Sequence, residues 1–166
     1  MSDESNDVRG LALTVFATSG NLIATGNALV APIGLTSAWW QVLGALRYSP
    51  APLPTVAIAR KMGLTRQAVQ RIVDLLEERG LVEFQANPHH RRAKLVVLTE
   101  AGLAAVTGAE QAADSLDKEI ADTVGSDRIR EAMQTLEAMN AILANWLDGA
   151  TPRSGDRRSS QKDVLS

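Results

Sequence analysis

Apolar residues along the N-terminal part of the chain recur with the spacing of an amphipathic helix. Over residues 7–31 the spacings are three, four and seven, and the stripe consists of Val8, Leu11, Val15, Leu22 and Leu29. Residues with these spacings lie on one face of a helix. Pro32 and Gly34 interrupt the pattern, because proline blocks helical continuation and glycine favours turns. The pattern therefore predicts one long helix that ends near Ala31.

A second helix follows this break and ends in a proline-rich loop. Thr36 or Ser37 can provide its N-cap, and Trp39 and Trp40 lie in the apolar segment that follows. The sequence SPAPLP at residues 49–54 contains three prolines, which prevent it from staying helical. We predict a loop there.

Two short helices separated by a glycine turn come next. Thr55 is the expected N-cap of the first helix, which ends at Gly63, and Leu64 and Thr65 restart the chain. Over residues 65–79 the apolar residues fall on one helical face and the polar residues mainly on the other. The apolar set is Ala68, Val69, Ile72, Val73 and Leu76, and the polar set is Arg66, Gln67, Gln70, Arg71 and Asp74.

A hairpin and two further helices complete the predicted structure. Residues 81–85 and 94–98 are short segments rich in valine, phenylalanine and leucine, and Asn87 and Pro88 mark a turn between them. Apolar residues then repeat every three or four positions in one helix that begins at Glu100 and in another that follows Gly125. Residues 149–166 are polar and rich in serine and arginine, which predicts a disordered tail.

The order of a helix, a turn, a second helix and a hairpin is that of a winged helix-turn-helix, whose second helix enters the major groove of DNA. Arginine pairs with guanine and glutamine with adenine, so Arg66, Gln67 and Gln70 are candidate base readers. The candidate contacts to phosphate come from residues of both helices. They are Thr55, Arg60, Lys61, Thr65 and Arg71. The alternative is an amphipathic surface helix whose polar face meets only water.

Charge separates along the chain, although the net charge is only -2. Residues 55–99 contain eight Lys/Arg and four Asp/Glu, whereas residues 100–148 contain three and ten. A local positive potential attracts phosphate more than net charge does, so the basic segment suits a polyanion. Chance clustering of surface charge accounts for these counts equally well.

Composition narrows the classes of protein. The chain has 166 residues, of which 45% are hydrophobic and 22% charged, as in a single globular domain. It has no cysteine, which excludes disulfides, thiolate metal ligands, cysteine nucleophiles and thiol-based sensing. No uninterrupted apolar run approaches the roughly 18 residues of a membrane span, and the acidic start lacks the basic opening of a secretory signal. These features predict a cytoplasmic protein without a membrane partner.

The central part of the chain resembles the MarR family of bacterial winged-helix transcription regulators. In residues 53–102, GLTRQAVQRIVDLLEERGLV is similar to the helix-turn-helix of the family, and RRAKLVVLTEAG is similar to its wing and the start of the next helix. The flanking helices have the same order and lengths. The resemblance implies a mainly α fold with a small β-hairpin wing, in which residues 36–99 form the DNA-binding domain and residues 7–31 and 100–148 form a helical dimerisation region.

The resemblance also gives the basic tip of the hairpin a role. Such wings reach the minor groove with an arginine, here Arg92 helped by Arg91, because a narrow minor groove attracts guanidinium groups. His89 and His90 belong to the same tip. The family has an aspartate two residues before the arginine, which pairs with it, and His90 stands in that position. Neutral histidine supplies no anion and protonated histidine repels arginine, so we predict a looser wing and a DNA affinity that rises as pH falls. Lys94 keeps its family position.

Dimerisation and effector binding are further expectations. The apolar stripes of the terminal helices exceed what one small layer can bury, and a two-fold operator needs two recognition helices about 34 Å apart. A monomer with a larger internal core is the alternative. Many relatives release DNA when a small, often aromatic compound binds between the dimer layer and the DNA-binding lobe. The resemblance places Phe16, Ile23, Trp39 and Trp40 near such a pocket, with core packing as the alternative role of each tryptophan.

The two histidines do not indicate a metal or catalytic site. His89 and His90 are adjacent on a turn and point apart, and the nearest carboxylate in sequence, Glu83, lies across the predicted hairpin. We therefore expect no metal, no cofactor and no enzyme activity. A winged helix that binds protein without contacting DNA is the other alternative, but it predicts an apolar or acidic outer face over residues 65–79. The sequence predicts a homodimeric DNA-binding transcription regulator, most often a repressor of a pseudo-palindromic operator.

Overall fold

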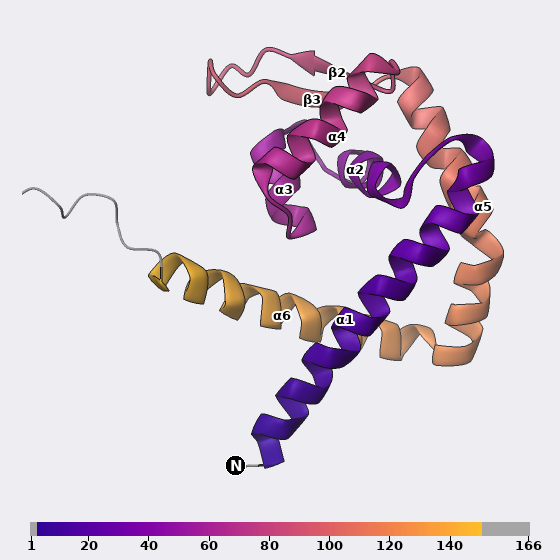
Figure 1. Ribbon diagram of the computed structural model, residues 1–166, viewed down its shortest axis with the longest axis vertical. Helices are drawn as coiled ribbons and strands as arrows, with labels where there is room; N and C mark the ends of the chain where they lie inside the picture. The colour runs from indigo at the N-terminus through magenta and orange to yellow at the C-terminus, as the bar shows by residue number, and fades with distance from the viewer. Residues whose placement is uncertain (1–2, 151–166) are drawn as a thin grey trace, which may run out of the picture. The chain divides into compact units, whose positions relative to one another are not determined.

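The computed structural model describes residues 3–150, which are mainly helical with a small antiparallel sheet (Figure 1). The helices are α1 (Asp3–Val30), α2 (Ser37–Arg47), α3 (Thr55–Met62), α4 (Arg66–Glu78), α5 (Glu100–Val124) and α6 (Ser126–Ala150), with a short 3-10 helix at Ala31–Ile33. The strands are β1 (Leu53–Pro54), β2 (Val82–Gln85) and β3 (Leu95–Leu98). The chain divides into two compact units, one up to Ser115 and the other from Leu116 onward.

The break between α1 and α2 follows from local hydrogen bonds. Gly34 has a φ of 75°, a backbone conformation that favours glycine. The Thr36 hydroxyl accepts a 3.2 Å hydrogen bond from the backbone N–H of Trp39 and so caps α2. The Asn27 side chain accepts a 2.8 Å bond from the N–H of Ser37 and ties the connection back to α1. α1 begins at Asp3, four residues before the expected start.

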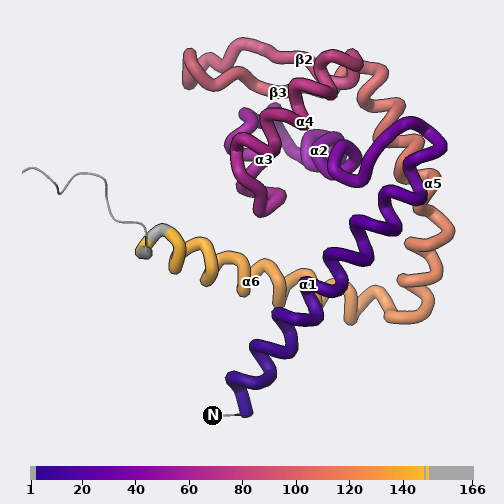
Figure 2. Tube along the Cα trace, in the orientation of Figure 1, coloured from indigo at the N-terminus to yellow at the C-terminus, as the bar shows by residue number. Residues whose placement is uncertain are grey.

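The predicted turn between the two short helices is present, and the tube in Figure 2 follows the chain through α3, α4 and the hairpin. Gly63 ends α3 with a φ of 63°. The N–H of Leu64 then donates to the carbonyl of Ala59 at 3.0 Å, which closes the end of the helix. Thr65 caps α4 by accepting a 3.1 Å bond from the N–H of Ala68.

The sheet contains one strand more than the predicted hairpin. β2 and β3 pair antiparallel, with Val82 opposite Leu98, and β1 pairs with the other edge of β3, where Leu53 lies opposite Val96. A loop was expected at β1, and that prediction is wrong. The strand has only two residues, one of them proline, and proline is tolerated only at a sheet edge.

A second correction concerns the start of α3. Thr55 was expected to cap this helix from outside, but Pro54 is the N-cap residue and forms no side-chain cap bond. Thr55 is the first helical residue and is 8% exposed. Proline can replace a cap here because an extended backbone before the helix is its preferred conformation.

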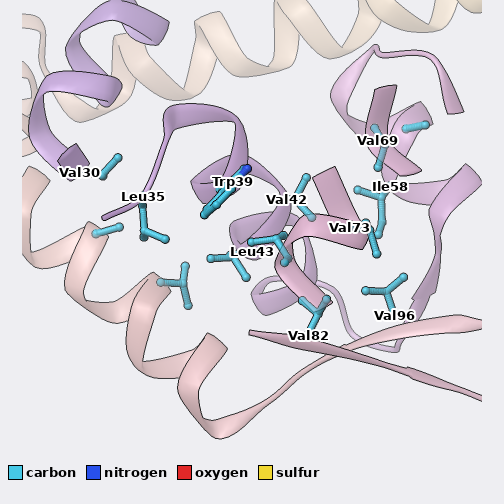
Figure 3. Close-up of a cluster of buried hydrophobic side chains, with 14 residues drawn as sticks. Val30, Leu35, Trp39, Val42, Leu43, Ile58, Val69, Val73, Val82 and Val96 are labelled. Carbon is cyan, nitrogen blue, oxygen red and sulfur yellow. The ribbon is translucent and has the colours of Figure 1, made fainter. Parts of the chain in front are cut away.

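The hydrophobic core lies between α2, α3, α4 and the sheet, and the end of α1 and the first half of α5 also contribute to it (Figure 3). Val69, Val73 and Leu76 on the inner face of α4 are fully buried, as their helical spacing predicted. They pack in one cluster with Val42 and Leu43 of α2. Burial of each such side chain contributes about 1.5–3 kcal/mol, so this cluster fixes which face of α4 remains outside.

Most apolar side chains of α1 stay outside this core. Within residues 3–150, one segment, Asp3–Ile33, is long and apolar enough to cross a membrane by length and composition. The segment contains no long uninterrupted apolar run, because uncharged serine, threonine, asparagine and glycine residues separate its apolar ones. An exposed apolar helix face also serves contacts between proteins.

At the other end of the chain, α6 includes the first two residues of the predicted tail, and residues 151–166 lie outside the described structure.

Candidate nucleic-acid interface

The outer face of α4 presents polar side chains because its inner face is held in the core. Arg66, Gln67 and Arg71 are exposed, and Gln70 is half-buried. The cap at Thr65 leaves the first backbone N–H groups of α4 at the surface, where the positive end of a helix favours anions. The side chains predicted to read bases therefore share one face of a well-anchored helix.

A groove of about 390 Å³ joins this face to the hairpin. α4 contributes Arg66 and Gln70 to its lining, and the hairpin contributes Arg92 and Lys94. The remaining lining residues are Pro54, Thr55, Val56, Phe84 and Ala93. Three cationic side chains thus converge on one groove whose lining contains no carboxylate, which produces a local positive potential.

An aromatic ring of the hairpin holds one of these cations in place. The Lys94 ammonium lies 5.5 Å from the centroid of the Phe84 ring, within the range of a cation–π interaction. Phe84 lies in β2 and Lys94 directly precedes β3, and both line the groove. The aromatic ring therefore orients the lysine toward the groove without neutralising its charge.

The tip of the hairpin is held by its own backbone. The Asn87 side chain accepts a 3.0 Å hydrogen bond from the N–H of His89, as in the turns that asparagine forms with following residues. The N–H of His90 donates to the Asn87 carbonyl at 3.3 Å, and the N–H of Ala93 donates to the His90 carbonyl at 3.0 Å. Asn87 therefore holds the turn just before the tip residues.

The four predicted tip residues, His89, His90, Arg91 and Arg92, are all exposed. Within residues 3–150 neither Arg91 nor Arg92 forms an ion pair, whereas Arg47 pairs with Glu110, Lys118 with Asp122, and Arg130 with Asp127. The guanidinium groups at the tip are therefore available for an external anion. In the same part of the chain no three His, Asp or Glu side chains gather in a way that could hold a metal ion.

Not every predicted contact joins the groove. Thr55 lies in its wall, but it is nearly buried. Arg60 and Lys61 are exposed on the last turn of α3 and do not line the groove. They flank the site as surface charges.

The four residues considered for an effector pocket have different surroundings. Trp39 is 9% exposed, and the guanidinium of Arg79 lies 4.3 Å from its ring centroid. Trp40 is half-buried against the core. Phe16 and Ile23 on α1 are 75% and 47% exposed. A separate apolar groove of about 260 Å³ lies elsewhere, between the end of α2, the loop after it, β3 and the start of α5.

Sequence reasoning missed two features of the interface. Lys94 and Phe84 were assigned only to strands, yet they line the groove. Gln70 donates a 2.7 Å hydrogen bond to Asp74, a partner that the spacing of four residues on a helix could have indicated. The groove itself had no signal in the sequence, because its walls belong to separate segments of the chain that only the fold brings together.

Comparison with known proteins places these features in a family context. The model of the MarR family matches residues 33–93. The chain is 33% identical over 139 residues to an uncharacterised protein of Mycobacterium tuberculosis, and the match covers 84% of this chain and 96% of that protein. Among solved structures, a MarR-family transcriptional regulator from Rhodococcus sp. RHA1 is 26% identical, with a TM-score of 0.68 over 84% of this chain and 96% of the other.

CouR from Rhodococcus jostii RHA1 is similar in two states. Its structure bound to p-coumaroyl-CoA has a TM-score of 0.69 and 25% identity, and the match covers 78% of this chain and 91% of CouR. Its structure bound to a 23-mer DNA duplex has a TM-score of 0.64 and 27% identity, with 84% of this chain and 96% of the other covered. The fold of the present chain is therefore one that binds duplex DNA in CouR.

Proposed function

Because the chain belongs to the MarR family of transcriptional regulators, we propose that it is a cytoplasmic, homodimeric repressor that binds a pseudo-palindromic operator. Transcription regulators of this family are not enzymes. The observation that carries the proposal is the groove in which Arg66 and Gln70 meet Arg92 and Lys94. Cations and an amide, with no carboxylate between them, suit a phosphate backbone together with the edges of bases.

The two walls of the protein groove are proposed to face different grooves of the DNA duplex. In the proposed complex the first turns of α4 lie in the major groove, and Arg92 enters the adjacent minor groove. The sugar-phosphate backbone between them then passes through the basic groove. Arg60, Lys61 and Arg71, which are exposed beside it, contact neighbouring phosphates. This arrangement separates base reading by α4 from the phosphate contacts of Arg60, Lys61 and Arg71.

The apolar surface of the terminal helices supports a dimer. Several large apolar side chains there are exposed, a pattern that monomeric proteins rarely show over a wide area. On α1 they are Val8, Leu11, Leu13, Phe16, Leu22 and Ile23; on α5 they are Leu103, Ile120 and Val124; on α6 they are Met133, Ile142, Leu143, Trp146 and Leu147. A second copy of the chain would cover them and would supply the second recognition helix.

A small aromatic compound is the proposed effector. The structure of CouR with p-coumaroyl-CoA supports an aromatic ligand by similarity. In this chain Trp40 is the better placed of the two tryptophans, because Trp39 is 9% exposed and already packs against Arg79. Phe16 and Ile23 are exposed on α1. A ligand at these side chains can act only by favouring one spacing of the two recognition helices over another.

Selection of genomic DNA fragments by the purified protein, followed by sequencing, tests the proposed function. We expect enriched fragments to share two inverted half-sites about 10 base pairs apart. A protein that enriches no fragment at low ionic strength would overturn the proposal.

A further inference from the structure

One hydrogen bond on the outer face of α4 sets the chemistry of the proposed base reader. The Gln70 side-chain nitrogen donates to the Asp74 carboxylate over 2.7 Å. Gln70 lines the basic groove and is half-buried, whereas Asp74 is exposed one turn further along the helix. Residues four positions apart on a helix lie on neighbouring turns of one face, so this hydrogen bond forms within α4 alone.

The partner fixes which way the amide faces. An ionised carboxylate only accepts hydrogen bonds, so the amide atom beside Asp74 must be the nitrogen. The Gln70 amide then retains one N–H and its carbonyl oxygen for another partner, and within residues 3–150 neither has one. Asp74 therefore fixes the orientation of the Gln70 amide, which then offers one N–H donor and one carbonyl acceptor to another partner.

This pair of groups matches one purine better than the other. In the major groove adenine presents the N7 acceptor beside the N6 donor, whereas guanine presents two acceptors, N7 and O6. A free glutamine could donate both of its N–H groups to guanine, but a glutamine held by a carboxylate has only one left. We propose that Asp74 is a positioning residue that makes Gln70 select adenine against guanine. The inference rests on the proposed function.

Asp74 is not itself expected to contact a base. The residues of a recognition helix that reach base edges lie in its first turns, and Asp74 is the ninth residue of α4. Its negative charge also opposes the approach of phosphate. Removal of this carboxylate should therefore have two opposite effects, a higher affinity for DNA of any sequence and a weaker choice between adenine and guanine.

Selection from randomised duplexes, followed by affinity measurements with single-base variants of the selected site, separates these effects. The variants are Asp74→Asn and Asp74→Ala, with Glu77→Gln as a control that removes the same charge from α4. The unaltered protein should prefer adenine to guanine by about five- to 150-fold at one position of each half-site. Both Asp74 variants should lose most of this preference while binding random DNA more tightly. Glu77→Gln should change random binding alone.

Gln70→Ala identifies the position that Gln70 reads. It should abolish the purine preference at the same position that the Asp74 variants affect. If the Asp74 variants or the Gln70→Ala variant keep the adenine preference, the inference is overturned, but the proposed function as a DNA-binding regulator is not. An unaltered protein that selects no sequence would overturn the proposed function and the inference together.

Discussion

The Tyr48 hydroxyl donates a 2.6 Å hydrogen bond to the Glu110 carboxylate and so joins the end of α2 to α5 across 62 positions of sequence. Arg47 strengthens the junction, since its guanidinium donates to the Thr107 hydroxyl at 2.6 Å and lies 3.4 Å from Glu110. α2 lies in the core of the DNA-binding lobe, and the first half of α5 contributes Val106 and Ala109 to the same core. These four side chains therefore link the end of α2 to the helix that follows the wing.

This junction predicts a sensitivity to alkali. The hydrogen bond to Glu110, and then partial desolvation, raise the pKa of Tyr48 above its usual value. Because the folded pKa is the higher one, the contribution to stability is complete below about pH 10 and is lost as pH rises through the folded pKa. As pH rises above about 10, the free energy of unfolding should fall less for Tyr48→Phe than for the unaltered protein, and urea unfolding measures this difference.

The chain offers a direct check of this shift. Tyr48 is its only tyrosine, so the ultraviolet absorbance of the phenolate reports its titration alone. Glu110→Gln should lower the pKa of Tyr48, because the amide carries no negative charge. An unchanged titration in that variant would show that Glu110 does not raise the pKa.

Gly102→Ala should destabilise the fold. A Cβ at this position would lie 1.9 Å from the backbone carbonyl oxygen of Leu81, a contact that only a shift of α5 against the turn before β2 can relieve. Such overpacking costs about 1–3 kcal/mol. The free energy of unfolding measures the effect, with Gly108→Ala on the same helix as the control, because a Cβ there would meet only a side-chain atom at 3.8 Å. Equal stabilities of the two variants would contradict the predicted clash.

His90→Asp should tighten the tip of the hairpin. An aspartate there can pair with Arg92, which forms no ion pair in the described chain. Amide hydrogen exchange over residues 88–93 should slow in this variant. His89→Asp, which places the carboxylate on the neighbouring residue of the turn, should slow it less. Equal exchange in both variants and the unaltered protein would count against this account of the tip.

The same residue predicts a pH dependence of DNA binding. Protonation of histidine adds a positive charge beside Arg92, which strengthens the attraction of the tip for phosphate. Affinity for the operator should therefore rise as pH falls, and His90→Gln should reduce this rise. An identical pH profile for the two proteins would assign the effect to other groups.

Phe16→Lys should weaken the dimer. Phe16 is 75% exposed in the single chain, and the proposed dimer covers its face of α1. A buried lysine without a partner opposes association. Sedimentation velocity should give a mass of two chains for the unaltered protein and a larger monomer fraction for the variant. Leu64→Lys, at a position 44% exposed on the turn before α4, should remain dimeric; a variant Phe16→Lys that dimerises equally well would place the interface elsewhere.

The sequence predicted features that depend on neighbours along the chain. The spacing of Val69, Val73 and Leu76 identified the buried face of α4, and the glycine at position 63 identified the turn before it. Both signals arise from local backbone geometry and the hydrophobic pattern of one helix. The polar face of α4 followed from the same pattern.

Features that depend on distant contacts could not be predicted in this way. β1 has only two residues and forms because β3 offers an open edge. Lys94 and Phe84 line the groove because the hairpin folds beside α4. The need for a glycine at position 102 arises from the carbonyl of Leu81, which belongs to another element. No local pattern encodes these approaches.

The most direct test of the account compares Arg92→Ala with Arg128→Ala in binding to the selected operator at several salt concentrations. Arg92 lines the basic groove, and Arg128 is an exposed arginine of α6. The account predicts that Arg92→Ala binds more weakly and that its dependence of log affinity on log salt is shallower by about 1 for each half-site, whereas Arg128→Ala matches the unaltered protein. Equal affinity and equal salt dependence of Arg92→Ala and the unaltered protein would contradict the claim that the groove between α4 and the hairpin binds DNA.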